Sequence, residues 1–255
     1  MSKFILTAPA LAIAATAAPA SAQDMPWTGF YVGASGAFVD TNSDWTGANI
    51  YQTVVDGGEG SFTLVPHNDP IAEKLSNNEI GGGGRIGFNW QSGSFVIGAE
   101  ADATFFGFDK AVTRTMPAAS YTLRSHASNL ETVRARAGFA AGSALLFVTG
   151  GAAFSNLKHE LSATDMSQVI VDGGEGSSTI GAATGNLAAS AKSDTGWTVG
   201  GGGELQVGPN LSVALTLLHV DFGSEALADS APPSSIAATV DTKMFVGMLG
   251  VNLRF

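Results

Sequence analysis

Residues 95–106 read Phe-Val-Ile-Gly-Ala-Glu-Ala-Asp-Ala-Thr-Phe-Phe, and residues 130–140 read Leu-Glu-Thr-Val-Arg-Ala-Arg-Ala-Gly-Phe-Ala. Glu100 and Asp102 in the first stretch, and Arg134 and Arg136 in the second, place like charges at alternate positions with an alanine between them. Successive side chains of a strand point to opposite faces, so each stretch predicts a β-strand with one apolar and one charged face. The opposite charges predict that the two strands are neighbours.

The same alternation recurs along the chain. It is found in eight segments, at about residues 30–39, 79–90, 95–106, 130–140, 145–154, 194–207, 211–221 and 243–255. The connections alternate between short ones (91–94, 141–144 and 208–210) and long ones (40–78, 107–129, 155–193 and 222–242). Strict alternation of short and long connections is typical of membrane barrels.

In every segment a run of four to six alternate positions on one face has no polar side chain, and aromatic side chains gather near the segment ends. Two aromatic girdles around a band of small apolar residues match the interfaces of a membrane barrel. The sequence therefore predicts an all-β fold, an eight-stranded antiparallel up-and-down transmembrane β-barrel with short periplasmic turns and long extracellular loops. The alternative is a soluble β-sandwich or lipocalin-like barrel, in which the apolar face would point inward.

The N-terminus has the pattern of a secretory signal peptide. Lys3 precedes an apolar run, and Ala20-Ser21-Ala22 fits the small-residue rule for cleavage before Gln23. We predict a signal peptide over residues 1–22 that directs export through the inner membrane, followed by one barrel domain over residues 23–255. An N-terminal transmembrane anchor is the alternative.

Composition excludes several functions. Only 13% of the 255 residues are charged, with 12 Lys and Arg against 22 Asp and Glu, for a net charge of −10. A nucleic-acid partner needs a basic face to neutralise phosphates, so we expect none. The chain has no Cys, which agrees with export without disulfides. The acidic excess falls in the predicted loops.

Six motifs are spread along the mature chain, at residues 27–33, 131–138, 147–152, 195–202, 219–223 and 252–255. Together they resemble those of the small opacity-like, porin-family outer-membrane proteins of α-proteobacteria. The resemblance implies an eight-stranded barrel in the cell outer membrane that is abundant at the surface. Where the family pattern leads us to expect a Lys and a Glu in the seventh strand, this chain has Ala214 and Thr216, so its lumen lacks one charge pair.

The charged face of the predicted barrel encloses a compact set of ionisable residues. They are Arg85, Glu100, Asp102, Arg134, Arg136, Glu204 and Arg254. The interior of an eight-stranded barrel is only wide enough for side chains, so we expect these groups to form a salt-bridge plug. A narrow ion-selective path is the alternative. The facing arginines disfavour a catalytic carboxylate pair, and we expect no catalytic residue, metal or cofactor.

One motif occurs twice: Val-Asp-Gly-Gly-Glu-Gly-Ser at residues 55–61 and again at 171–177. Alternation before each copy and glycine within it predict two surface hairpins that extend the barrel wall. A second hypothesis is that the acidic residues of the two copies contact a cation or a partner. Those residues are Asp56, Glu59, Asp172 and Glu175.

The four histidines are spread over the predicted outer end. His67, His126 and His159 fall in long loops, and His219 lies near the end of the seventh strand. Loop histidines are usually solvated, and haem binding is the alternative.

The chain ends on Phe255, with Leu253 and Val251 on the same face. This pattern predicts a signal that the outer-membrane assembly machinery reads by strand addition. The other expected partners are outer-membrane lipid and host or surface partners that contact the loops. We predict a non-enzymatic barrel that contributes to envelope structure and presents surface loops. The alternative is a porin-like channel for small solutes or ions.

Overall fold

A computed structural model describes residues 27–56, 62–115, 119–165, 167–173, 176–183, 186–231 and 234–255. The predicted cleavage between Ala22 and Gln23 lies outside these residues. The acidic side chains of the repeated motif, Asp56, Glu59, Asp172 and Glu175, also lie outside the described part.

The fold is a closed antiparallel barrel with strand order β1-β10-β9-β8-β5-β4-β3-β2, and a separate two-stranded sheet, β6-β7, lies outside it. The barrel strands are β1 (Gly29–Asp56), β2 (Phe62–Ser92), β3 (Phe95–Thr115), β4 (Ala119–Ala141), β5 (Ala144–Asp165), β8 (Asn186–Gln206), β9 (Leu211–Ala231) and β10 (Ser234–Arg254). The hairpin strands are β6 (Ser167–Gly173) and β7 (Gly176–Ala183). The predicted eight-stranded barrel is confirmed.

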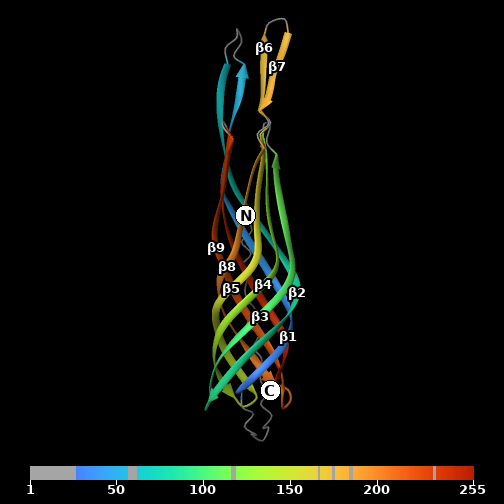
Figure 1. Ribbon diagram of the computed structural model, residues 1–255, viewed down its shortest axis with the longest axis vertical. Helices are drawn as coiled ribbons and strands as arrows, with labels where there is room; N and C mark the ends of the chain where they lie inside the picture. Colours follow the sequence, from blue (N-terminus) through green and yellow to red (C-terminus); the bar gives the residue numbers. More distant parts are fainter. Residues whose placement is uncertain are drawn as a thin grey trace, which may run out of the picture.

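Figure 1 shows an elongated barrel with its C-terminus and tight turns at one end and the β6–β7 hairpin at the other. Gly93 and Gly142, in the turns after β2 and β4, have φ angles of 60° and 61°, a left-handed conformation that glycine adopts without strain. In membrane barrels the short turns face the periplasm, so the elongated end is the outer end. In the described part of the chain, no helix is long and apolar enough to cross a membrane.

The prediction of four long loops is wrong in its detail, because most of those residues continue the barrel strands. β1 has 28 residues and β2 has 31, whereas about 9–11 residues suffice for a strand to cross the bilayer. Residues 40–56 of β1 pair with β2 along their whole length. The barrel therefore rises far above the outer aromatic girdle, and we call this part the outer barrel.

The side chains exchange faces between the two parts of the barrel. In the membrane band, apolar residues such as Ile97 (53% exposed) and Val133 (57%) point outward and charged residues point inward. In the outer barrel, a buried apolar cluster fills the interior, and its members include Trp45, Leu123 and Leu161. The alternative of an apolar face turned inward thus describes the outer barrel, although it is wrong for the membrane band.

The outer barrel is divided into two sheets. Among the described residues, β2 pairs with β3 only from Gly82 to Ser92, and β8 pairs with β9 only from Trp197 to Gln206. All other neighbouring strands remain paired far beyond these points. We call the group β9-β10-β1-β2 the β1 sheet and the group β3-β4-β5-β8 the β5 sheet. The cluster that contains Trp45 packs between them.

Irregularities in the strands explain why the alternation of apolar and polar residues does not continue in one register from the membrane segments into the outer barrel. The register shifts between His126 and Leu130 in β4, and buried positions change from odd numbers before the shift to even numbers after it. β8 changes parity in the same way across a shift opposite Phe154 and Leu157. An extra residue in one strand of a pair moves the following side chains to the other face.

The described strand residues on either side of each copy of the repeated motif pair with one another. Asp56 of β1 pairs with Phe62 of β2, and Gly173 of β6 pairs with Gly176 of β7. The β1 strand that leads into the first copy extends the barrel wall. The second copy forms the detached hairpin, and β6 contacts β1.

Candidate functional site

The lumen is filled by successive layers of side chains. At the periplasmic end, Trp27 lies in an apolar cluster with Val96, Ala140, Leu145 and Phe147. The charged residues come next, and an apolar cluster that includes Val39, Phe108 and Val246 follows at the height of the outer girdle. Beyond it lie a polar layer and then the apolar core of the outer barrel.

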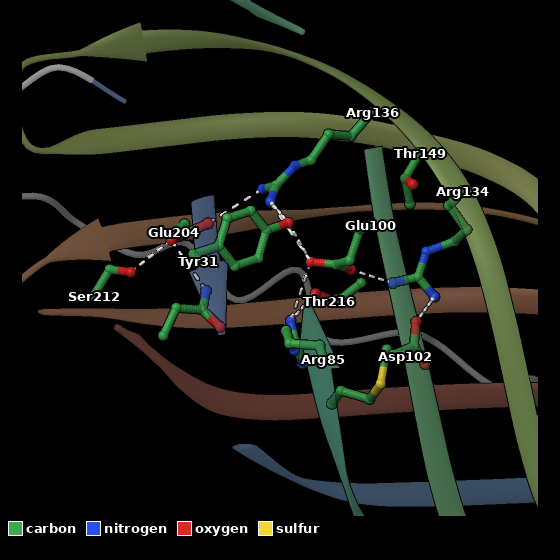
Figure 2. Close-up of polar contacts among 12 residues, drawn as sticks. Tyr31, Arg85, Glu100, Asp102, Arg134, Arg136, Thr149, Glu204, Ser212 and Thr216 are labelled. Atoms are coloured by element: carbon green, nitrogen blue, oxygen red, sulfur yellow. Dashed lines mark hydrogen bonds and ion pairs between the residues drawn. The ribbon is translucent and has the colours of Figure 1, made fainter. Parts of the chain in front are cut away.

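All seven charged residues predicted for the lumen lie together in one buried ion-pair network. Figure 2 labels all of them except Arg254. Its first centre is the acidic pair of β3. Arg134, one strand away on β4, contacts Glu100 through Nη2 and Asp102 through Nη1, the latter at 2.7 Å. Thr132 donates a second hydrogen bond to Asp102 at 2.6 Å. Arg134, whose side chain is fully buried, thereby compensates both carboxylates.

The second centre is Glu204 on β8. It accepts from Arg136 at 3.2 Å, from Arg254 at 3.3 Å, from Ser212 at 2.5 Å and from Asn252 at 3.0 Å. Arg136 also lies 3.7 Å from Glu100, so its guanidinium joins the two centres.

Several members of the network were not predicted. Tyr31 of β1 donates to Glu100 at 2.7 Å and accepts from Arg136 at 2.9 Å. The Arg136 guanidinium lies 3.9 Å from the centre of the Phe147 ring, a cation–π contact. Gly87 makes room for Tyr31, because a Cβ there would overlap the tyrosine ring. The signal for Tyr31 was its position on the inward face of the first strand, between Phe30 and Val32.

Arg85 is the least compensated charge of the network. Its nearest carboxylate is Glu100 at 4.0 Å, and its Nη1 lies 3.5 Å from Thr216 Oγ1. Its Nε and Nη2 atoms are buried without a hydrogen-bond partner. Thr216, where the family resemblance leads us to expect a glutamate, faces Arg85 with a hydroxyl group and no charge.

The ion-pair network can link the strands of the barrel wall, but it presents no free carboxylate to a substrate. The side chains of Glu100 and Asp102 are 5% and 3% exposed, and both are bound by arginine. A catalytic carboxylate needs contact with its substrate and a proton to exchange. The burial of this pair and its arginine contacts keep a substrate from reaching it.

A polar layer in the outer barrel links the two sheets. Ser125 of β4 lies 2.9 Å from His159 Nδ1 on β5, and both belong to the β5 sheet. From the β1 sheet, Trp45 Nε1 donates to Ser125 at 3.2 Å, and Thr242 Oγ1 lies 3.5 Å from His159 Nε2. Burial lowers the pKa of His159 from 6.5 to about 4. The expectation that this histidine is solvated is wrong, because the predicted loop is a strand whose odd positions face the core.

The other histidines do not join this layer. His126 is half-buried on β4, and His219 is exposed beside Trp197, with 5.7 Å between ring centres. His67 lies on β2 and is half-buried. Within the described ranges, no group of three or more His, Cys, Asp or Glu side chains has the geometry to hold a metal ion.

An eight-stranded antiparallel barrel with a lipid-facing apolar band, two aromatic girdles and a charged, filled lumen defines a small outer-membrane β-barrel protein. The chain belongs to the outer membrane protein beta-barrel domain family, whose model matches residues 8–255. Its location is the cell outer membrane.

Among characterised proteins, the chain is similar to the 31 kDa outer-membrane immunogenic protein of Brucella melitensis. The two are 28% identical over 224 residues, which cover 85% of this chain and 79% of the relative. Among solved structures, it is similar to OprG from Pseudomonas aeruginosa, with a TM-score of 0.44, 11% identity and coverage of 89% and 96% of the two chains. Ail of Yersinia pestis gives a TM-score of 0.33, 12% identity and coverage of 86% and 99%.

The network predicts that its arginines contribute unequally to stability. Arg134→Met leaves two buried carboxylates without their main cation and should lower the free energy of unfolding by about 3–5 kcal/mol. Arg85→Met removes the weakly paired excess charge and should cost less than half of that. Urea unfolding in lipid vesicles, followed by heat-dependent gel mobility, measures both variants. Equal losses would contradict the assignment of Arg134 as the centre of the network.

The buried histidine predicts a specific loss of stability in acid. Between pH 6.5 and 4 the unfolded chain binds a proton at His159 that the folded protein does not, so stability falls as the pH is lowered through this window. The full effect is about 3 kcal/mol, and it should be absent in His159→Gln. Hydrogen exchange of the outer barrel measures it, with His126→Gln as the control. An unchanged pH dependence in His159→Gln would rule out this role.

Proposed function

We propose that the protein is a non-enzymatic structural component of the outer membrane that holds a tall barrel above the lipid surface for contact with the surroundings. The observation that carries the proposal is the filled lumen. The apolar cluster at the height of the outer girdle contains residues from six of the barrel strands, β1, β3, β4, β5, β9 and β10, and none of them is more than 8% exposed.

A filled lumen favours this role over that of a pore. A water path through the barrel would expose the side chains that line it, as in channels with a polar lumen. Here a charged network lies between two apolar clusters, and a third apolar cluster closes the outer barrel. An ion that entered from either end would have to cross layers that give it no polar ligand.

The height of the outer barrel supports a role in presentation. Residues 40–56 of β1 continue beyond the outer girdle, and at ~3.3 Å per residue with a tilt of ~40° they add on the order of 40 Å. The β6–β7 hairpin lies at the far end (Figure 1). Such a rigid extension carries its hairpins well away from the lipid headgroups.

We also propose that the last strand serves in assembly. Phe255, Leu253 and Val251 face outward on or directly after β10, and Phe255 is 72% exposed at the periplasmic rim. Its backbone N–H donates to Phe30 O at 2.9 Å, where the end of the chain closes the barrel against β1. A terminal strand with this apolar face can be read by strand addition before the barrel closes.

Single-channel recording tests the structural role against the pore. Protein refolded into planar bilayers should give no conductance steps, because the apolar layers exclude ions. Heat-dependent gel mobility of the same sample confirms that it is folded. Steady, ion-selective steps from folded protein would instead assign it to the channels.

Extension of the chain tests the assembly role. A short polar tail after Phe255 should reduce surface levels in cells, since it moves the terminal aromatic away from the end. The same tail should leave refolding into vesicles unchanged, because that process needs no assembly machinery. If the tailed protein reaches the surface at the level of the unmodified chain, the role in assembly is wrong.

A further inference from the structure

Two lysines face each other on the outer barrel without a counter-charge. Lys158 of β5 is directly opposite Lys192 of β8 in the antiparallel register, and both are exposed on the outward face. Directly opposite side chains have Cβ atoms about 5 Å apart, and like charges in this position destabilise the sheet. In the described part of the chain, neither ammonium group has an ion pair or hydrogen bond with the protein.

The acidic residues nearby are mostly engaged elsewhere. Arg124 of β4 forms a two-bond pair with Asp109, at 2.9 and 2.6 Å, and lies 3.9 Å from Glu160. These hydrogen bonds hold the pKa of Asp109 below its usual value. Asp194 lies two residues from Lys192 on the same strand, without an ion pair to it. Half-buried His126, opposite Lys158 on β4, adds no negative charge.

Two other lysines of the outer barrel, both on the β1 sheet, have carboxylate partners. Lys243 of β10 lies 2.7 Å from Asp241 and 3.9 Å from Asp221, and Lys74 of β2 lies 3.9 Å from Asp44. All of these residues belong to the β1 sheet. The β1 sheet therefore supplies carboxylates to these two lysines, whereas the facing pair on the β5 sheet has no such partner.

The lysine pair lies directly above the edge of the hydrocarbon layer. Phe154 and Trp197, on the same two strands, are 39% and 50% exposed and belong to the outer aromatic girdle. Lys158 follows Phe154 by four positions in β5, which at ~3.4 Å per residue and a tilt of ~40° is about 10 Å further out. Lysine side chains bend back toward such an interface. The two ammonium groups therefore reach the layer of lipid headgroups.

We propose that Lys158 and Lys192 bind the phosphate group of a lipid in the outer leaflet of the membrane. One phosphate between the two ammonium groups turns a repulsive pair into two attractive contacts, and the girdle below provides the apolar surface for the acyl chains. Asp194 sets a limit on affinity, because its carboxylate repels the same phosphate. The site anchors the β5 side of the barrel at a fixed depth, a property that goes beyond the structural role proposed above.

The test compares refolded protein in phosphatidylcholine vesicles with and without phosphatidic acid, which exposes a phosphate monoester. The readout is the midpoint of thermal unfolding by gel mobility. Phosphatidic acid should raise the midpoint for the wild type, and Lys158→Gln/Lys192→Gln should lose more than half of the rise. The control Lys74→Gln/Lys243→Gln should keep it, and Asp194→Asn should increase it.

Vesicles of phosphatidylcholine alone provide a second comparison of stability between the double variant and the wild type. There the lysine repulsion is not relieved by an anionic lipid, so Lys158→Gln/Lys192→Gln should be at least as stable as the wild type. An equal rise with phosphatidic acid in wild type and double variant would overturn the proposal. So would an equal rise on adding inorganic phosphate to phosphatidylcholine vesicles, since free phosphate would then be the ligand. Neither outcome bears on conductance.

Discussion

The surroundings of each strand change from lipid to water at the outer aromatic girdle, and the side chains change roles there. Below the girdle the outward face is apolar because lipid offers no hydrogen bonds, so polar groups must turn inward and satisfy one another. Above it the outward face meets water, so apolar side chains such as Trp45 and Leu161 turn inward and form a core. On the same continuous strands, apolar side chains therefore face outward in the membrane half and inward in the outer half.

The inward polar groups of the membrane half cannot remain unpaired. A buried charge is tolerated only with partners, and Arg134, Arg136 and the three carboxylates provide them for each other. Arg136 joins the two centres, so the network links strands on different sides of the barrel. The apolar clusters on either side keep water from competing for these bonds. The filled lumen is therefore both the support of the wall and the reason to assign a structural role.

The sequence alone was sufficient to predict the features that the membrane imposes on every strand. Alternation located the membrane segments, the tight turns and the seven lumen charges, because lipid tolerates no charge on the outward face. It did not locate the outer strands, because parity changes at the irregularities in β4 and β8 and the apolar face moves inward. The burial of His159 and the division into two sheets depend on contacts between strands far apart in the chain, which alternation within one segment does not encode.

The exchange of faces can be tested in this chain directly, since it contains no cysteine. Single cysteines at Ser162 and Ala163 place a thiol on the outward and the inward face of β5 in the outer barrel, where Ala163 is 5% exposed. The account predicts rapid labelling of Ser162→Cys by a polar maleimide and protection of Ala163→Cys until the protein is unfolded. Equal labelling rates in the folded protein would mean that the outer barrel encloses water, and would contradict a lumen filled by side chains.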